Sequence, residues 1–323
     1  MNAIIIVLIT FALFEILYRF AVIDFYKAEI NGLNTTETLQ KDSVDFLWFG
    51  DSFSATSSDM NYVDKLRTNN PAISIVNASI PGTGIRQVNT FASARINNHQ
   101  PKAIVYQIYV GNDLIDVDHL WDWEKFSISR NFYWEASDYF LSLSYLNRKL
   151  AVLNVSKEIR LEGMLKDDFS TDLYDIRTKR FIYGNTSYIE NTLTLQTPFG
   201  NRYETWLKHI QRFLATVPND VTVYFLWIPH CAQVNDYYLQ NMKSLGAEFK
   251  DEELIQKSVY PFFNAAKKDL KAYTNVRHLN PLEYFRMHDT IDNRIYFLND
   301  PHLNYYGNEV LSEFLEQQLP LKN

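Results

Sequence analysis

Ser52, Asp300 and His302 supply the three kinds of side chain that nucleophilic catalysis by a serine needs. A serine hydroxyl is a weak nucleophile until a base removes its proton, and a third group must hold the base in place. His302 is the natural base, and Asp300 is the natural group to orient its imidazole. If Ser52 lies at a helix N-terminus, the helix dipole also favours the negative charge that develops there.

The elements that must position these residues alternate along the chain. Continuous apolar runs, typical of strands covered on both faces of a parallel sheet, occupy residues 44–49, 72–77, 103–110 and 221–228, and a weaker run occupies residues 275–280. Helical patterns occupy residues 58–69, 85–98, 202–216, 252–273 and 304–318, and we expect Pro261 to kink the fourth of these helices. Repeated alternation of strand and helix predicts a doubly wound α/β fold, a three-layer sandwich.

Four polar segments stand where predicted strands end or where the last helix begins. Gly50-Asp51-Ser52 follows the first strand, residues 77–84 (NASIPGTG) follow the second, residues 111–113 (GND) follow the third, and residues 299–304 (NDPHLN) precede the last helix. In an open parallel sheet, reactive groups gather at the carboxyl ends of the strands. We therefore expect these segments to meet at one edge of the sheet.

Together the four segments resemble the sequence blocks of the SGNH, or GDSL, hydrolase superfamily, which carry in order a serine, a glycine, an asparagine and a histidine with its acid. The resemblance covers roughly residues 43–318. It implies a flavodoxin-like, five-stranded parallel sheet with an inserted cap-like segment, and a catalytic triad of Ser52, His302 and Asp300. It also implies an oxyanion hole made by the backbone N–H groups of Ser52 and Gly82 and the side-chain amide of Asn112.

The spacing of the acid departs from the commonest form of this family. There the acid stands three residues before the histidine, and Asn299 occupies that position here, whereas Asp300 is two residues before His302. The D-x-H spacing of Asp300 and His302 resembles the spacing in relatives that act on bacterial polysaccharides. In addition, asparagine lacks the charge that stabilises an imidazolium. We therefore predict Asp300 as the orienting group, with Asn299 as the alternative.

Each segment also has a simpler structural interpretation. The serine and asparagine segments, and Asn304, consist of residue types that favour helix N-caps, and Gly82 and Gly84 could be ordinary turn glycines. The other histidines have no companion pattern, and no HExxH or paired-histidine spacing indicates a metal. The sequence also contains no G-x-S-x-G elbow and no glycine-rich phosphate loop.

Composition argues against other classes of function. The 323 residues carry a formal net charge of -7 without a lysine or arginine cluster, so we expect no nucleic-acid partner. The single cysteine, Cys231, cannot form an internal disulfide or a thiolate metal cluster. We predict neither a cofactor nor a metal.

The first residues predict a membrane anchor. The stretch 3–23 is strongly apolar, with Glu15 and Arg19 as its only charged residues, and it has about the 20 residues that a spanning helix requires. These two charged residues are four apart, so they share a helix face and can form an ion pair. The alternative is an amphipathic helix that docks on the folded domain.

This pattern divides the chain into an anchor (1–27), a polar linker (28–43) and an SGNH hydrolase-like domain (44–323). The domain contains an insertion at 114–200, because this stretch is far longer than one crossover needs. The tryptophans of the insertion, Trp121, Trp123 and Trp134, could stack on sugars or pack in a core. We expect the insertion to wall the pocket.

The superfamily includes lipases, thioesterases, carbohydrate esterases and O-acetyltransferases. An anchor and linker before such a domain resemble bacterial relatives that modify cell-envelope or exported polysaccharides. This resemblance implies a serine esterase or O-acyltransferase that acts on an O-acetylated polysaccharide or another small-molecule or glycan ester through an acyl-serine. The alternatives are a non-catalytic glycan-binding or scaffold protein with this fold and a lipase or thioesterase.

The resemblance also implies a single-pass protein of the inner (cytoplasmic) membrane, with its N-terminal helix in the bilayer and its catalytic domain in the periplasm. The charge pattern favours the opposite orientation, because Arg19 and Lys27 lie on the C-terminal side of the apolar stretch.

Overall fold

The structure of the protein, a computed structural model, describes residues 2–20, 22, 43–55, 61–117, 136, 139–140, 142–143, 168–174, 188–196 and 199–321. Its centre is a five-stranded parallel sheet in the order β2-β1-β3-β4-β5. The strands are β1 (Phe46–Phe49), β2 (Ile75–Asn77), β3 (Ala103–Tyr109), β4 (Thr222–Ile228) and β5 (Val276–Leu279). All five predicted strands are therefore confirmed, and their order is the flavodoxin-like one, with its topological switch between β1 and β3.

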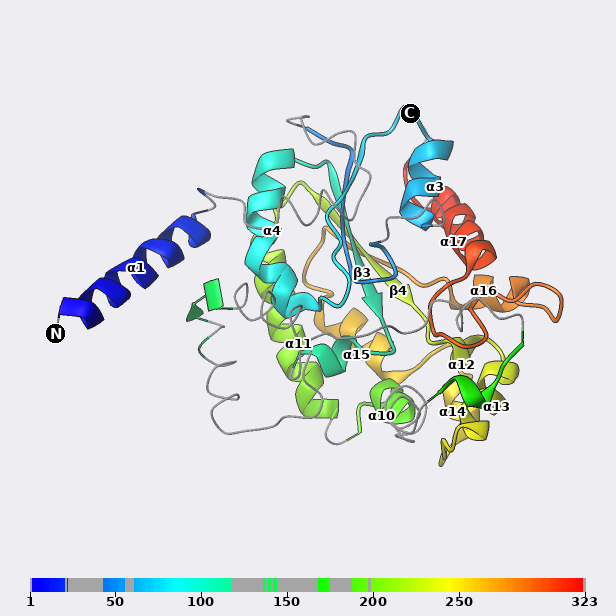
Figure 1. Ribbon diagram of the computed structural model, residues 1–323. Coiled ribbons are helices and arrows are strands. Elements are labelled where there is room, and N and C mark those ends of the chain that lie inside the picture. The colour runs from blue at the N-terminus through cyan, green and yellow to red at the C-terminus, as the bar shows by residue number, and fades with distance from the viewer. Residues whose placement is uncertain are drawn as a thin grey trace.

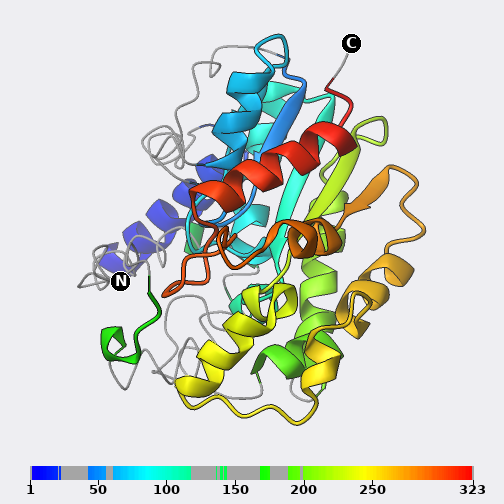
Figure 2. The same ribbon diagram turned by 90° about the vertical axis from the view of Figure 1, so that its right-hand side faces the viewer.

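Helices cover both faces of the sheet, which gives the predicted three layers (Figure 1). The long helices α4 (Ile85–His99) and α11 (Phe199–Leu214) pack together on one face, and α3 (Tyr62–Asn69) and α17 (Tyr305–Gln318) pack together on the other (Figure 2). The remaining described helices are α1 (Asn2–Arg19), α5 (Asp113–Asp116), the 3-10 helix η1 (Thr171–Leu173), α10 (Tyr188–Thr194), α12 (Cys231–Val234), α13 (Asp236–Ser244), α14 (Glu252–Ile255), α15 (Pro261–Asp269) and α16 (Leu282–His288).

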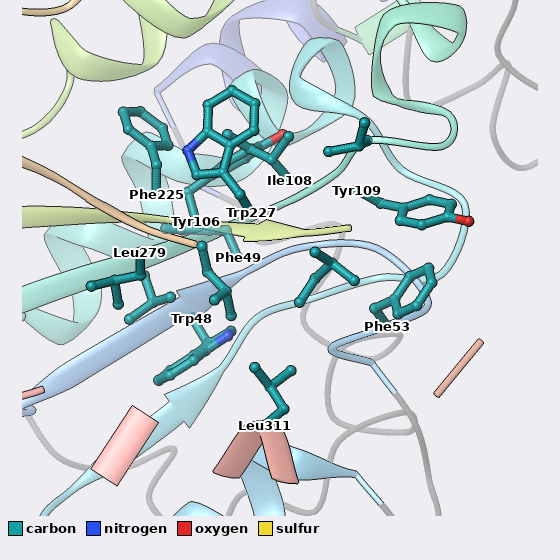
Figure 3. Close-up of a cluster of buried hydrophobic side chains, with 14 of the residues drawn as sticks. Trp48, Phe49, Phe53, Tyr106, Ile108, Tyr109, Phe225, Trp227, Leu279 and Leu311 are labelled. Carbon is teal, nitrogen blue, oxygen red and sulfur yellow. The ribbon is translucent and has the colours of Figure 1, made fainter. Parts of the chain in front are cut away.

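Neighbouring side chains of β1 point to opposite faces of the sheet. Trp48 lies against Tyr62 of α3, with ring centroids 5.9 Å apart, on the side where Figure 3 shows Leu311 of α17. Phe49 points to the other face, where its ring lies 5.6 Å from that of Phe213 in α11. Because both faces are buried, an alternating pattern would leave polar side chains in a core, which explains the continuous apolar runs.

The single helix predicted over 252–273 is wrong, because the structure has two helices there, α14 and α15. Pro261 does not kink a helix but is the first residue of α15, where its missing N–H group needs no partner. The residue before it, Tyr260, is extended, with φ of -129° and ψ of 153°. The proline ring disfavours a helical conformation for that residue, so the first helix has to end earlier.

Much of the predicted insertion, with Trp121, Trp123 and Trp134, lies outside the described residues. Its described parts include residues 168–174, which contain η1, and the helix α10. The sequence patterns missed α12, α13 and α16, which lie in the connections that follow β4 and β5. Two of them are only four and seven residues long, too short for a clear apolar period.

The predicted pair in α1 is present, with Arg19 Nη2 3.0 Å from Glu15 Oε1. Glu15 also accepts hydrogen bonds from the backbone N–H (3.0 Å) and the hydroxyl (2.5 Å) of Ser142. Among the residues that the structure describes, no helix combines the length and the apolar character needed to cross a membrane. The predicted membrane-spanning helix is therefore not supported.

The helix α17 lies directly on the chain that leads to His302. A Cβ atom on Gly307 would clash with the carbonyl oxygen of Ile295, so only glycine permits this approach of the helix to the preceding connection. Asn304 caps the helix by accepting a hydrogen bond from the N–H group of Gly307 (2.9 Å). The start of α17 thereby fixes the position of residues 295–304.

Gly307→Ala is therefore expected to destabilise the protein by about 1–3 kcal/mol, because the added methyl group forces the helix and the connection apart. Urea unfolding of the purified protein measures this change. Glu309→Ala, at an exposed position of the same helix, is the matched control and should leave the midpoint nearly unchanged. Equal midpoints for the two variants would contradict the close packing at Gly307.

Candidate active site

Ser52 lies on a tight turn directly after β1. The Asp51 side chain accepts a hydrogen bond from the N–H group of Phe53 (2.9 Å), and the Asp51 carbonyl accepts from those of Ser54 (3.2 Å) and Ala55 (2.9 Å). The expectation that Ser52 begins a helix is wrong, because the described residues 51–55 form turns and α3 begins only at Tyr62.

A buried polar group from the neighbouring strand holds this turn. Gln107 of β3 accepts hydrogen bonds from the Asp51 N–H group (3.0 Å) and the Ser54 hydroxyl (3.1 Å), and the Ser54 hydroxyl also bonds to the Tyr62 hydroxyl (2.6 Å). A Cβ atom on Gly50 would lie 2.5 Å from Gln107 Oε1 and 2.7 Å from Ser54 Oγ. Glycine is therefore required at position 50 because of this close approach.

His302 connects Ser52 to Asp300. Its Nε2 atom lies 2.7 Å from Ser52 Oγ, and its Nδ1 atom bonds to Asp300 Oδ1, which also accepts the backbone N–H of His302 (2.8 Å). With a carboxylate at Nδ1, that nitrogen carries the proton and Nε2 can accept the serine proton. The Asp300 side chain is 5% exposed and that of His302 is 33% exposed, so the acid is covered while the base remains accessible.

The chain around Asp300 and His302 closes as a short hairpin-like loop. Tyr296 and Leu303 form an antiparallel bridge, and the N–H group of Phe297 donates to the carbonyl of His302 (3.1 Å). The Tyr296 hydroxyl ties this loop to the end of β4 by donating to the carbonyl of Pro229 (2.6 Å). The loop therefore presents the acid and the base at the edge of the sheet where the strands end.

Phe53, next to the serine, was not recognised from the sequence. Its ring stacks on the imidazole of His302, with centroids 4.8 Å apart, and its centroid lies 4.3 Å from that of Tyr109 at the end of β3. Figure 3 shows Phe53 and Tyr109 side by side where the strands end. Phe53 is buried, so its ring limits the orientations open to the histidine.

The glycine segment is attached to the serine turn. The carbonyl of Gly50 accepts hydrogen bonds from the N–H group of Ile80 (3.0 Å) and the hydroxyl of Thr83 (3.3 Å). Between them, Gly82 has a φ of 62°, a left-handed conformation that favours glycine. The turn interpretation of Gly82 is therefore correct, and the same turn lies beside the serine turn.

Asn112 stands at the N-cap position of α5, but its side chain makes no capping hydrogen bond. Its neighbour Asp113 instead accepts a hydrogen bond from the N–H group of Tyr109 (2.8 Å). A capping role therefore does not explain the Asn112 carboxamide, whereas Asn304 is a true cap of α17. Ser52, Gly82 and Asn112 follow β1, β2 and β3, so all three lie at the same edge of the sheet.

Burial and charge act in opposite directions on His302. Burial by itself lowers its pKa, but the negative charge of Asp300 and the hydrogen bond to it outweigh this effect, with a smaller contribution from Asp51. The net result is a pKa above the ordinary value of 6.5. The imidazole is therefore a stronger base than a free histidine, which suits it to remove a serine proton.

Three further carboxyl groups are buried beneath this edge. Burial raises the pKa of Asp51, and it raises the pKa values of Asp113 and Asp116 far above the ordinary range. The charge of Asp51 raises the last two further. Within the described part of the chain, no group of three or more histidine, cysteine, aspartate or glutamate side chains could hold a metal ion.

No family model matches the sequence, and neither does any curated protein. Among the solved structures, one similar protein comes from Streptococcus pneumonia and its description names platelet activating factor; it is 13% identical, the match covers 91% of this chain and 90% of that chain, and the TM-score is 0.45. A GDSL-like lipase from Bacteroides thetaiotaomicron is 11% identical, with 91% of this chain and 94% of that chain covered and a TM-score of 0.36. A catalytic mutant of an acetylxylan esterase from Geobacillus stearothermophilus is 12% identical, with 87% of this chain and 96% of that chain covered and a TM-score of 0.38. These values are low, so the site has to be judged from the geometry of this chain.

That geometry defines a class of protein. The sheet has the flavodoxin-like order, and Ser52, His302 and Asp300 form one hydrogen-bonded chain at the carboxyl ends of its strands. This is the arrangement that the sequence resemblance to the SGNH, or GDSL, hydrolases implied.

Asp300→Asn is expected to lower kcat/KM on the order of 10⁴-fold, by analogy with other serine triads. His302 must be unprotonated to accept the serine proton, so activity falls as the pH falls through its raised pKa. Removing the charge of Asp300 lowers that pKa, so the acid limb of the pH–rate profile should move to lower pH. Hydrolysis of 4-nitrophenyl acetate measures both effects, and a larger loss from Asn299→Ala than from Asp300→Asn would contradict the assignment.

Asp116→Asn is expected to stabilise the protein at pH 8. Because its folded pKa is raised above 3.8, ionisation of Asp116 opposes folding, and the stability it contributes is lost as the pH rises through that folded pKa. The amide cannot ionise, so the gain should be present at pH 8 and should vanish below about pH 4. Urea unfolding at both pH values measures it, with the exposed Asp220→Asn as control; equal gains at both would contradict the electrostatic cause.

Proposed function

We propose that this protein is a serine esterase or O-acyltransferase that acts on O-acylated carbohydrate through an acyl-serine intermediate. The observation that carries the proposal is the 2.7 Å hydrogen bond between Ser52 Oγ and His302 Nε2, with Asp300 on the other side of the imidazole. Nucleophilic catalysis requires that a serine bonds to a histidine and the histidine to an acid, as Ser52, His302 and Asp300 do. A helix cap or a structural polar contact does not require this order of groups.

The chemistry follows from these contacts. Ser52 Oγ attacks the ester carbonyl carbon while its proton moves to His302 Nε2, and Asp300 stabilises the imidazolium that forms. The backbone N–H groups of Ser52 and Gly82 and the Asn112 amide are assigned to the oxyanion, where each donor is worth about 3–4 kcal/mol. His302 then returns the proton to the leaving alkoxide, and the acyl group remains on Ser52.

The second half of the reaction needs an acceptor hydroxyl. His302 removes its proton while the oxygen attacks the acyl-serine, and then gives that proton to the Ser52 oxygen as the bond between Ser52 and the acyl group breaks. Water as acceptor gives hydrolysis, and a sugar hydroxyl gives acyl transfer. The polysaccharide substrate, with acetyl as the acyl group, is supported by the resemblance of the D-x-H spacing to relatives that act on bacterial polysaccharides. A location outside the cytoplasm stays a prediction from the resemblance of the N-terminal segment and linker to bacterial relatives that modify cell-envelope polysaccharides.

Ser52→Ala should abolish turnover of 4-nitrophenyl acetate and labelling by a fluorophosphonate probe, because both require the serine oxygen. Folding should be unaffected, since Ser52 is only half-buried and its side-chain contact is to His302. Mass spectrometry locates the probe, and thermal unfolding of both proteins controls for folding. Ser258→Ala, which removes an exposed serine from the surface, is the matched control and should keep full labelling.

Activity of Ser52→Ala within tenfold of the wild type would overturn the nucleophile assignment. A folded wild-type protein that takes up no probe would instead favour a non-catalytic glycan-binding or scaffold role. Mass spectrometry of products from an activated acetyl donor, with and without oligosaccharide acceptors, separates hydrolysis from transfer. Acetylated oligosaccharide formed only by the wild type would establish the transferase.

A further inference from the structure

The side chain of Asn299 forms two hydrogen bonds with the backbone of the insertion, one as acceptor and one as donor. Its Oδ1 atom accepts a hydrogen bond from the N–H group of Ser170 (2.9 Å), and its Nδ2 atom donates to the carbonyl of Asp168 (2.8 Å). The residue is 8% exposed and both bonds are partly buried, so a lost partner is costly. Asn299 therefore acts as a clamp between residues that are more than 120 positions apart in sequence.

The clamped residues belong to a small folded unit. Ser170 precedes η1, and its carbonyl accepts the N–H group of Leu173 (3.3 Å). The rings of Phe169 and Tyr174 pack with centroids 6.2 Å apart, and Tyr174 is buried. Residues 168–174 thus form a compact segment whose attachment to the body of the protein includes the Asn299 carboxamide.

The other side of the clamp is the catalytic loop. Asn299 directly precedes Asp300, and both lie in the loop closed by the Tyr296–Leu303 bridge, which also carries His302. A segment fixed at Asn299 is therefore held beside the acid and the base. The clamp also needs an amide, because an aspartate at position 299 has no donor for the Asp168 carbonyl.

We propose that Asn299 is a positioning residue that holds residues 168–174 against the catalytic loop, and that this segment forms a wall for the part of the substrate beyond the reacting carbonyl. The inference deepens the proposed function and rests on it for the substrate, a carbohydrate ester. Asn299, at the position where the family usually has its acid, thus contributes to substrate binding, while its neighbour Asp300 orients His302.

The first test does not depend on activity. Hydrogen exchange of the peptide that contains residues 168–174 should be at least about tenfold faster in Asn299→Ala than in the wild type, because the Ser170 amide loses its acceptor. Asn293→Ala removes an exposed carboxamide from the connection before the same loop and should leave this exchange unchanged. Unchanged exchange in Asn299→Ala would overturn the clamp.

The second test compares two esters. Asn299→Ala should raise KM for an acetylated xylo-oligosaccharide about tenfold, while kcat/KM for 4-nitrophenyl acetate falls less than about threefold, because the small ester does not reach the wall. The acid limb of the pH–rate profile should keep its position. Equal losses on both esters, or a shifted limb, would mean that Asn299 acts on His302 and would overturn the wall.

The third test asks whether position 299 can hold the catalytic acid. Adding Asn299→Asp to Asp300→Asn should restore no activity, and Asn299→Asp alone should raise KM for the oligosaccharide ester as Asn299→Ala does. Recovery in the double variant would overturn the proposal. If the wild type turns over neither ester, the proposed function fails, and the exchange experiment still decides whether the clamp exists.

Discussion

The constraint on which the site depends is the buried contact between the end of β1 and the middle of β3. Gln107 holds the turn of Ser52 through the Asp51 N–H group and the Ser54 hydroxyl, and the missing side chain of Gly50 lets the two segments approach. In a buried site these hydrogen bonds are strong and expensive to leave unmade. These contacts therefore fix the position of Ser52 relative to the sheet.

Burial acts on all the ionisable groups at this edge, and their neighbours decide the outcome. Asp113 and Asp116 have other carboxyl groups nearby, so burial and repulsion both raise their pKa values. His302 is paired with Asp300, and the attraction between them overcomes the effect of burial. The same edge thus disfavours ionisation of Asp113 and Asp116 and strengthens His302 as a base.

The loop before α17 combines two tasks in neighbouring residues. Asp300 points to His302, and Asn299 points to the backbone of residues 168–170. Gly307 allows α17 to approach this loop, and Asn304 caps the helix, so the loop rests on a rigid element. The loop therefore supports both the base and the attached segment of the insertion, each through a different side chain.

The sequence by itself determined the fold class and the strands β1 to β4, because continuous apolar runs reflect burial on both faces, which local composition reveals. The fifth strand, at the edge of the sheet, gave only a weaker run, because two of its four residues are not buried. It also supplied the residue types Ser52 and His302, since a nucleophile and a base are chemically distinctive. Only the tertiary structure placed Phe53 on His302 and Gln107 beneath the serine turn, because both contacts join chain segments that no local pattern relates. The closure of the loop likewise decided that Asp300 lies against His302 and Asn299 against the insertion. The direction of a side chain depends on the backbone conformation and not on sequence spacing alone.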